Sequence, residues 1–412
     1  MKTNKLLRSS ILCGLLLISL MMLSCTKADS SEDIQAEYTR MASTLSTTKV
    51  FALGDSLTSG YSYGNTNDTM YYVKGDTSFA TLVASQLGNS TGTSNVGFTY
   101  PADLTATCAG SAGAGDYSCY TNITHGAPFN LLGVPGVRIE DLESSSITRD
   151  YFSTSAQGLF SLIVRNTVTS NSLYNSSMVD QIVLGQPTIT LVWIGANNIL
   201  GPTTGGYVTT TGSDATPITK AEFKTYLENI VSRITNQTSS RIILANLPAP
   251  TAIPFVTATN PSLISAGFGQ LFMVENGVTT LQSLATYGGQ ILASAASDIT
   301  NSGKGAPTNP LLDSDWLSAE ELATLNARLT EFNAAISEVG TAYNIPVVDM
   351  AAVFNTMATG ETETTTGMGL NMTNAFGADA VHPSETGQKG IANMFIQAIN
   401  TKYGTSYSQY TP

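Results

Sequence analysis

The sequence predicts an α/β fold in which a parallel β-sheet is covered by helices on both faces. Short apolar runs alternate with helical patterns, and each run is apolar at nearly every position, as expected for strands buried on both sides. Neither an internal repeat nor a clear linker interrupts the alternation, so we expect one domain over residues 47–412. The predicted strands are KVFALG (49–54), APFNLLGV (127–134), TITLVWIG (188–195), RIILANLP (241–248) and IPVVDM (345–350).

The predicted helices carry their own start and stop signals. SFATLVASQLG (78–88) begins with a serine and ends on a glycine. TKAE at 219–222 and SAEE at 318–321 are capping-box patterns, and each precedes a long amphipathic segment. A last helix is expected from about 386 to 399.

Three segments are longer than a compact α/β domain requires, and we expect them to be insertions. Long excursions at the carboxyl ends of strands usually carry binding residues. The segments lie near residues 61–126, 199–218 and 250–316.

The N-terminus has the pattern of an export signal. Basic residues precede ILCGLLLISLMML, an apolar stretch too short to span a bilayer comfortably. The LSC that follows resembles the lipobox of bacterial lipoproteins. We therefore expect a signal peptide over 1–24 and a lipidated Cys25 with a tether over 25–46. The protein would then be an outer-membrane lipoprotein, on either the periplasmic or the surface face of that membrane. An ordinary signal peptide cut nearby is the alternative.

Composition and cysteines fit an exported protein. Only 12% of the residues are charged, and the net charge of −12 argues against nucleic acid as a partner, because phosphate binding needs clustered Lys and Arg. With Cys13 removed and Cys25 lipidated, Cys108 and Cys119 remain as an even pair. A disulfide between them would close a short loop and contribute about 3 kcal/mol; two free thiols are the alternative.

Ser56 follows the first predicted strand, in FALGDSLTSG. A serine hydroxyl becomes a nucleophile only with a base in hydrogen-bond reach and a group that orients the base. The chain has two histidines, His125 in a polar loop and His382 in GADAVHPSETG. Only His382 has a carboxylate close in sequence, Asp379. Taken alone, His382 could equally be a surface histidine in a loop.

Acyl transfer also needs donors aimed at the oxyanion that forms. Asn197 projects from the turn after the third predicted strand, and Gly136 follows the second. Ser56 starts a helix, so its own N–H is unpaired. Individually, Asn197 is also interpretable as a turn residue and Gly136 as a bend.

Together, these blocks resemble the SGNH (GDSL) hydrolase family over residues 47–403. The resemblance implies a three-layer α/β/α, flavodoxin-like five-stranded parallel sheet. It makes Ser56 the nucleophile, His382 the base and then the acid, and Asp379 the residue that orients the imidazole. The N–H groups of Ser56 and Gly136 and the side chain of Asn197 would form the oxyanion hole. The blocks carrying the resemblance are Gly54-Asp55-Ser56-Leu57, Gly136, Gly195-x-Asn197 and Asp379-x-x-His382.

Two positions depart from the family pattern. The third block usually reads Gly-x-Asn-Asp, whereas position 198 is Asn here. In the second block an Asn often stands five residues before the Gly, and here it is displaced by one, to Asn130. The Asn-Leu-Pro of 246–248 is similar to a segment that follows the fourth strand in lipase-type members.

The sequence therefore predicts an exported or lipid-anchored serine ester hydrolase of the lipase or esterase type that works through an acyl-enzyme. A carbohydrate O-acetyl esterase is the alternative within the same chemistry, and a non-catalytic surface-binding protein is the alternative from another class. We expect no cofactor and no metal, because the sequence has no His/Cys cluster to hold one. Acyl length and oligomeric state are left open.

Overall fold

A computed structural model describes most of the chain from Lys49 to the C-terminus. The expected signal and tether at 1–46, including Cys25, lie outside the described residues, and so do Cys108, Cys119 and His125. The described residues are 49–63, 71–73, 75–92, 97–101, 128–144, 176–204, 217–275 and 277–412.

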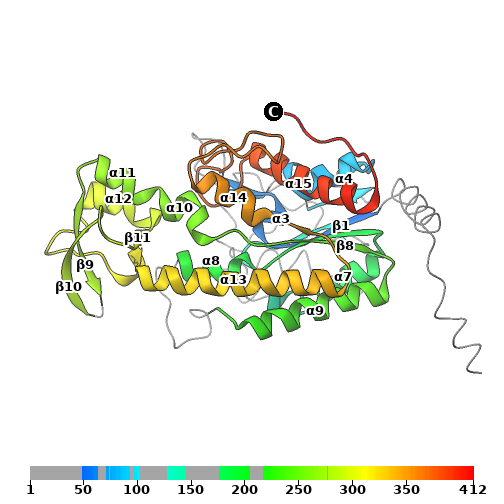
Figure 1. Cartoon of the computed structure of the whole chain (residues 1–412), viewed down its shortest axis with the longest axis horizontal. Coiled ribbons are helices and arrows are strands. Elements are labelled where there is room, and N and C mark those ends of the chain that lie inside the picture. The colour runs from blue at the N-terminus through cyan, green and yellow to red at the C-terminus, as the bar shows by residue number, and fades with distance from the viewer. Residues whose placement is uncertain are drawn as a thin grey trace, which may run out of the picture.

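The centre of the molecule is a five-stranded parallel sheet with the strand order β13-β8-β7-β1-β6 (Figure 1). Numbered along the chain, this is the order 2-1-3-4-5 of flavodoxin-like folds, so the predicted fold class is confirmed. Gly54 lies opposite both Gly133 and Trp193, so three strands end level at one edge. The strands are β1 (Val50–Gly54), β6 (Leu131–Gly133), β7 (Ile189–Trp193), β8 (Arg241–Ala245) and β13 (Val347–Val348).

All five strands fall within the predicted runs, but β6 and β13 are much shorter than the runs that contain them. The run at 345–350 contributes only two residues, because Asp349 already caps the next helix by accepting a hydrogen bond from the Ala352 N–H. At the start of β6, Asn130 donates to the Val50 carbonyl at 2.7 Å. Its side chain therefore joins β6 to β1 at the start of β6, whereas Gly136 lies beyond the other end of that strand.

Helices cover the sheet on both faces, which makes three layers (Figure 1). On one face Phe79 stacks on Phe395 with ring centroids 4.9 Å apart, and on the other Phe223 stacks on Phe332 at 4.2 Å. Both predicted capping boxes are formed. The first face carries α4 (Phe79–Gln86), α14 (Met350–Ala358) and α15 (Glu385–Tyr403), and the second carries α7 (Met178–Gly185), α9 (Lys220–Gln237) and α13 (Ala319–Ala342).

The start of the second expected insertion is helical. Residues 199–204 belong to helix α8 (Ala196–Thr204), which continues directly from the turn after β7. Buried Ile199 packs into the main core and fixes this helix to the sheet. Residues 205–216 of the same expected insertion lie outside the described residues.

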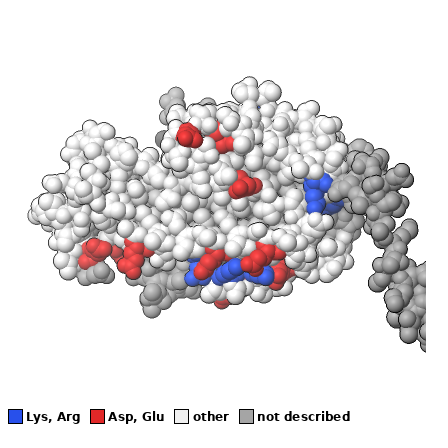
Figure 2. Space-filling view, in the orientation of Figure 1, with Lys and Arg blue, Asp and Glu red and all other residues white. Residues whose placement is uncertain are grey.

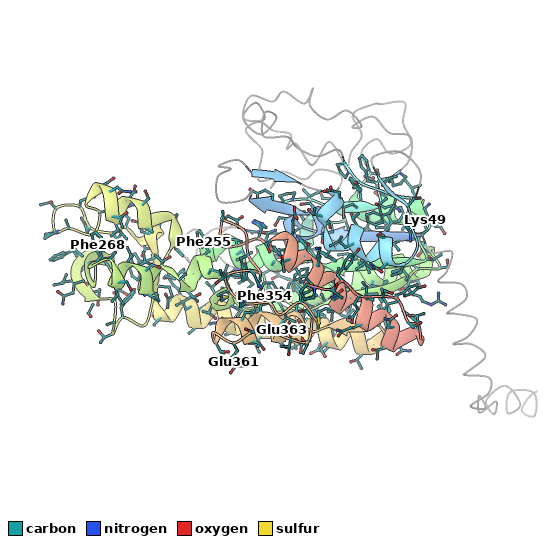
Figure 3. The ribbon with its side chains drawn as sticks, turned by 90° about the horizontal axis from the view of Figure 1, so that it is seen from above. Lys49, Phe255, Phe268, Phe354, Glu361 and Glu363 are labelled. Carbon is teal, nitrogen blue, oxygen red and sulfur yellow. The ribbon has the colours of Figure 1, made fainter. Side chains whose placement is uncertain are left out.

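The segment expected as the third insertion forms a small module at one end of the molecule. It has a separate cluster of buried side chains around Trp316 and Met273, and Figure 3 shows Phe268 there, far from Phe354 near the middle. Its elements are α10 (Pro254–Thr257), α11 (Thr259–Ser265), β9 (Gln270–Glu275), β10 (Val278–Ser283), β11 (Gln290–Ile291), α12 (Ala293–Ser302) and β12 (Trp316–Leu317). Other short elements in the described ranges are α3 (Ser56–Ser59), β2 (Tyr61–Tyr63), β3 (Tyr71–Val73), β4 (Thr91–Gly92) and β5 (Phe98–Thr99).

The surface carries few charges. On the face drawn in Figure 2, charged side chains gather mainly in a stripe along α9 and α13, where Lys220 and Lys224 pair with Glu338 at 2.6 and 3.0 Å. Exposed pairs of this kind contribute little to stability. Among the helices in the described ranges, none has the length and apolar character needed to cross a membrane.

Candidate active site

The tight turn after β1 places Ser56 at the edge of the sheet. Asp55, not Ser56, caps helix α3, and its Oδ1 accepts a hydrogen bond from the Leu57 N–H at 3.0 Å. Gly54 is required before the turn, because a Cβ there would collide with the Thr58 side chain and the Trp193 carbonyl. Ser56 therefore stands at the first helical position, where its N–H has no partner within the helix.

The loop before α15 brings Asp379 and His382 to Ser56. The Nδ1 of His382 lies 2.6 Å from Asp379 Oδ2, and its Nε2 lies 2.9 Å from Ser56 Oγ. Asp379 Oδ1 accepts the N–H groups of Val381 and His382, each at 3.0 Å. Ala380 takes a left-handed conformation (φ 59°) so that the chain can turn this tightly. The three polar side chains form one hydrogen-bonded line.

The surroundings of Asp379 keep its carboxylate ionised. Burial raises the pKa, but the hydrogen bonds from the His382 ring and from two backbone N–H groups outweigh burial, so the pKa of Asp379 lies below its ordinary value. The ring of Tyr61 packs against that of His382 with centroids 4.3 Å apart. This contact of Tyr61 could not be predicted, because no sequence pattern links a residue near Ser56 to a histidine more than 300 positions later.

Asp55 is a second buried carboxyl beside this line. Its side chain is 1% exposed, and Oδ2 has no hydrogen-bond partner among the described residues. Burial raises the pKa of Asp55 to about 7, and the hydrogen bond from Leu57 and the nearby His382 offset this effect only in part. Near neutral pH the Asp55 carboxyl of the folded protein is therefore partly protonated.

We expect Asp55→Asn to raise the melting temperature by several degrees at about pH 8 and by much less at about pH 5. The pKa of Asp55 is about 7 in the folded protein and has its ordinary value of 3.8 in the unfolded chain. Between these two pH values, Asp55 is protonated in the folded protein and ionised in the unfolded chain. The buried charge thus destabilises the protein above pH ~7, and this cost disappears as the pH falls toward ~4. Asparagine keeps an oxygen for the Leu57 N–H and removes the charge. Thermal unfolding followed by circular dichroism measures both values.

Asp349→Asn is the matched control, since Asp349 also caps a helix but is exposed. An Asp55→Asn variant whose melting temperature differs from that of the parent equally at both pH values would contradict the assignment.

The segments after β6 and β7 contact each other. Gly136 lies in the turn after β6 with φ 85°, a conformation that favours glycine. Asn197 lies in the first turn of α8, and its Nδ2 donates to the Val137 carbonyl at 3.0 Å. Gly133 must be glycine, because a Cβ there would collide with the backbone of Ser59 in α3. The turn that carries Ser56 is thus in close contact with the strand that leads to Gly136.

An apolar pocket opens beside Ser56 and His382. The empty space at this pocket is about 520 Å³ when the solvent at its open mouth is included. Apart from these two residues, every lining residue is apolar, and none of them was singled out in the sequence as a pocket residue. They are Leu57, Ala196, Ile199, Leu200, Pro248, Ala249, Pro250, Ile253, Leu329, Phe354 and Val381.

The segment at 246–250 forms one wall of this pocket and is firmly held. Asn333 of α13 accepts from the Leu247 N–H and donates to the Leu247 carbonyl, both at 2.8 Å. Trp193 Nε1 donates to the Asn246 carbonyl at 3.0 Å. Because these bonds fix the backbone just before Pro248, the wall is rigid.

No group of three or more His, Cys, Asp or Glu side chains among the described residues could hold a metal ion.

The chain has a three-layer α/β/α fold with a flavodoxin-like sheet, and a serine at the end of its first strand is hydrogen-bonded to a histidine just before its last helix. The sequence model of the GDSL-like lipase/acylhydrolase family matches residues 50–395. The chain belongs to this family and is an ester-hydrolysing enzyme.

Solved structures resemble the chain only distantly. A lipase/acylhydrolase from Enterococcus faecalis is 15% identical, with 88% of this chain and 100% of that chain covered and a TM-score of 0.36. A family 3 carbohydrate esterase from Clostridium thermocellum is 12% identical, with coverages of 88% and 99% and a TM-score of 0.36. A catalytic mutant of an acetylxylan esterase from Geobacillus stearothermophilus is 11% identical, with coverages of 88% and 97% and a TM-score of 0.38. No curated protein matches the chain.

Proposed function

We propose that the enzyme cleaves carboxylic esters through an acyl-enzyme on Ser56. The observation that carries this proposal is the line from Asp379 through His382 to Ser56, with separations of 2.6 and 2.9 Å. Ser56 Oγ attacks the ester carbonyl while His382 Nε2 takes its proton. The alcohol leaves with that proton, and an acyl ester remains on Ser56. Water then attacks the acyl ester, giving its proton to Nε2, and the acid is released as Ser56 regains its hydrogen.

The oxyanion is stabilised by three donors in this proposal. They are the N–H of Ser56, the N–H of Gly136 and the side-chain amide of Asn197. One amide hydrogen of Asn197 is used by the Val137 carbonyl, which orients the group and leaves the second hydrogen for the oxyanion.

Asn197→Ala is expected to lower kcat by about 100-fold or more with a small change in KM, because the donor acts on charge that develops only in the transition state. Steady-state hydrolysis of a p-nitrophenyl ester measures both constants. Asn236→Ala, an exposed change on α9, is the control. An unchanged kcat in Asn197→Ala would remove this residue from the oxyanion hole.

The apolar pocket favours an ester with an apolar acyl chain, and hence an esterase or lipase over a carbohydrate O-acetyl esterase. An acetyl group would leave most of these apolar side chains without a partner. Burying one methylene contributes about 0.8 kcal/mol, so kcat/KM should rise roughly fourfold for each added methylene until the pocket is full. A series of p-nitrophenyl esters from acetate to dodecanoate tests this proposal.

Leu329→Trp, which fills part of the pocket, is expected to shift the optimum toward shorter acyl chains. Leu184→Trp, a change at an exposed leucine on α7, is the matched control and should leave the optimum in place. A parent enzyme that prefers acetate would instead favour the carbohydrate esterase.

We further propose that the enzyme is exported and anchored to the outer membrane through a lipid on Cys25. The support is the apolar stretch that ends in Leu-Ser-Cys at 23–25. Cys25→Ser should prevent incorporation of radiolabelled palmitate and move the protein from the membrane fraction to the soluble fraction. Retention of the label by this variant would contradict the anchor.

A further inference from the structure

Asn198, next to the proposed oxyanion residue, uses both ends of its side chain. It is buried, with 2% of its surface exposed. Its Oδ1 accepts the N–H of Ile139 at 3.1 Å, and its Nδ2 donates to Glu140 Oε2 at 2.7 Å. The bond from Asn197 to the Val137 carbonyl is a third link, so three hydrogen bonds join the first turn of α8 to the segment that follows Gly136.

These bonds join two segments that meet only through tertiary contact. Gly136 follows β6 and Asn197 follows β7, and both must lie at hydrogen-bond distance from the same oxyanion. A displacement of 1 Å in such a site can cost about 100-fold in rate. We propose that Asn198 and Glu140 are a pair of positioning residues that hold the two sides of the oxyanion hole in register. This inference rests on the proposed hydrolysis through Ser56.

The charge of Glu140 explains why an amide stands at position 198. Helix α8 contributes no charged residue of its own, and the charged residues near Glu140 on its own segment are Arg138, Asp141 and Glu143. The guanidinium of Arg138 lies against Gly201, further along α8. An aspartate at 198 would still accept the Ile139 N–H, but its second oxygen would face a carboxylate at hydrogen-bond distance. Two carboxylates so close cannot both stay ionised without a large cost.

The test exchanges the polarity of the pair. Asn198→Asp alone should lower kcat by about 100-fold with little change in KM. In Asn198→Asp/Glu140→Gln the glutamine amide donates to the aspartate, so the bond is restored with donor and acceptor reversed. We expect kcat of the double variant to return to within about twofold of Glu140→Gln alone. Asn236→Asp on α9 is the control for an added negative charge, and thermal unfolding is recorded for every variant.

Three outcomes would overturn the proposal. One is an Asn198→Asp enzyme with the kcat of the parent. Another is a double variant no more active than Asn198→Asp, and the third is a double variant that fails to fold. If Asn198→Asp itself does not fold, the comparison of kcat between the double variant and Glu140→Gln still tests the proposal. Failure of this inference is distinct from failure of the proposed function, because in the latter case the parent and Ser56→Ala would hydrolyse esters equally.

Discussion

Ser56→Ala is expected to lower kcat by about 10⁶-fold and to leave the fold intact. The substitution removes only Oγ, which is the atom 2.9 Å from His382 Nε2. Helix α3 keeps its cap, because Asp55 and the Leu57 N–H are untouched. Without Oγ the imidazole has no hydroxyl at position 56 to deprotonate, so an acyl-enzyme on this residue cannot form. Hydrolysis of p-nitrophenyl butyrate and covalent labelling by a fluorophosphonate measure the two consequences.

Ser59→Ala is the matched control. Ser59 lies in the same short helix, is also buried, and donates its hydroxyl to the Ser56 carbonyl at 2.9 Å. Its loss should affect stability more than chemistry, and the variant should still react with the fluorophosphonate. Labelling that persists in Ser56→Ala would place the nucleophile elsewhere in the chain.

The sequence was sufficient for the elements whose signals are local. An apolar run marks each of the five strands, because nearly all of their residues are buried in the described structure. Capping boxes mark the starts of α9 and α13, because their bonds span only three residues. The sequence also predicts that Ser56, His382 and Asp379 act together, because a serine nucleophile needs a base and a group that orients the base. The structure places the three side chains in one hydrogen-bonded line.

Features that depend on contacts between distant segments could not be predicted. The bond from Asn198 to Glu140 joins residues 58 positions apart, and the packing of Tyr61 on His382 spans more than 300. The pocket combines residues from six separate segments, so no single motif reveals it. The length of β13 was overestimated, because Asp349 is compatible with a strand end and with a helix cap, and only the fold decides between them.

Asp379→Asn is expected to lower kcat by about 10⁴-fold, although it changes one atom. Asp379 Oδ1 accepts two backbone N–H groups while Oδ2 accepts from His382 Nδ1. The single oxygen of asparagine must stay with the backbone donors, so the amide nitrogen turns toward the imidazole. That nitrogen donates to Nδ1, which places the ring proton on Nε2. The imidazole can then no longer accept the proton of Ser56.

The same variant has a second expected effect, on stability. Because the pKa of Asp379 lies below its ordinary value of 3.8, the carboxylate stabilises the folded protein above about pH 4, and this contribution is lost as the pH falls through the lowered pKa. Asp379→Asn should therefore melt below the parent at neutral pH, with a gap that closes on acidification below pH ~4. Asp349→Asn, at the exposed cap of α14, should leave kcat unchanged. Since Ser56 and the proposed oxyanion donors remain in place, a kcat of Asp379→Asn within about tenfold of the parent would show that the imidazole does not depend on Asp379 for its tautomer.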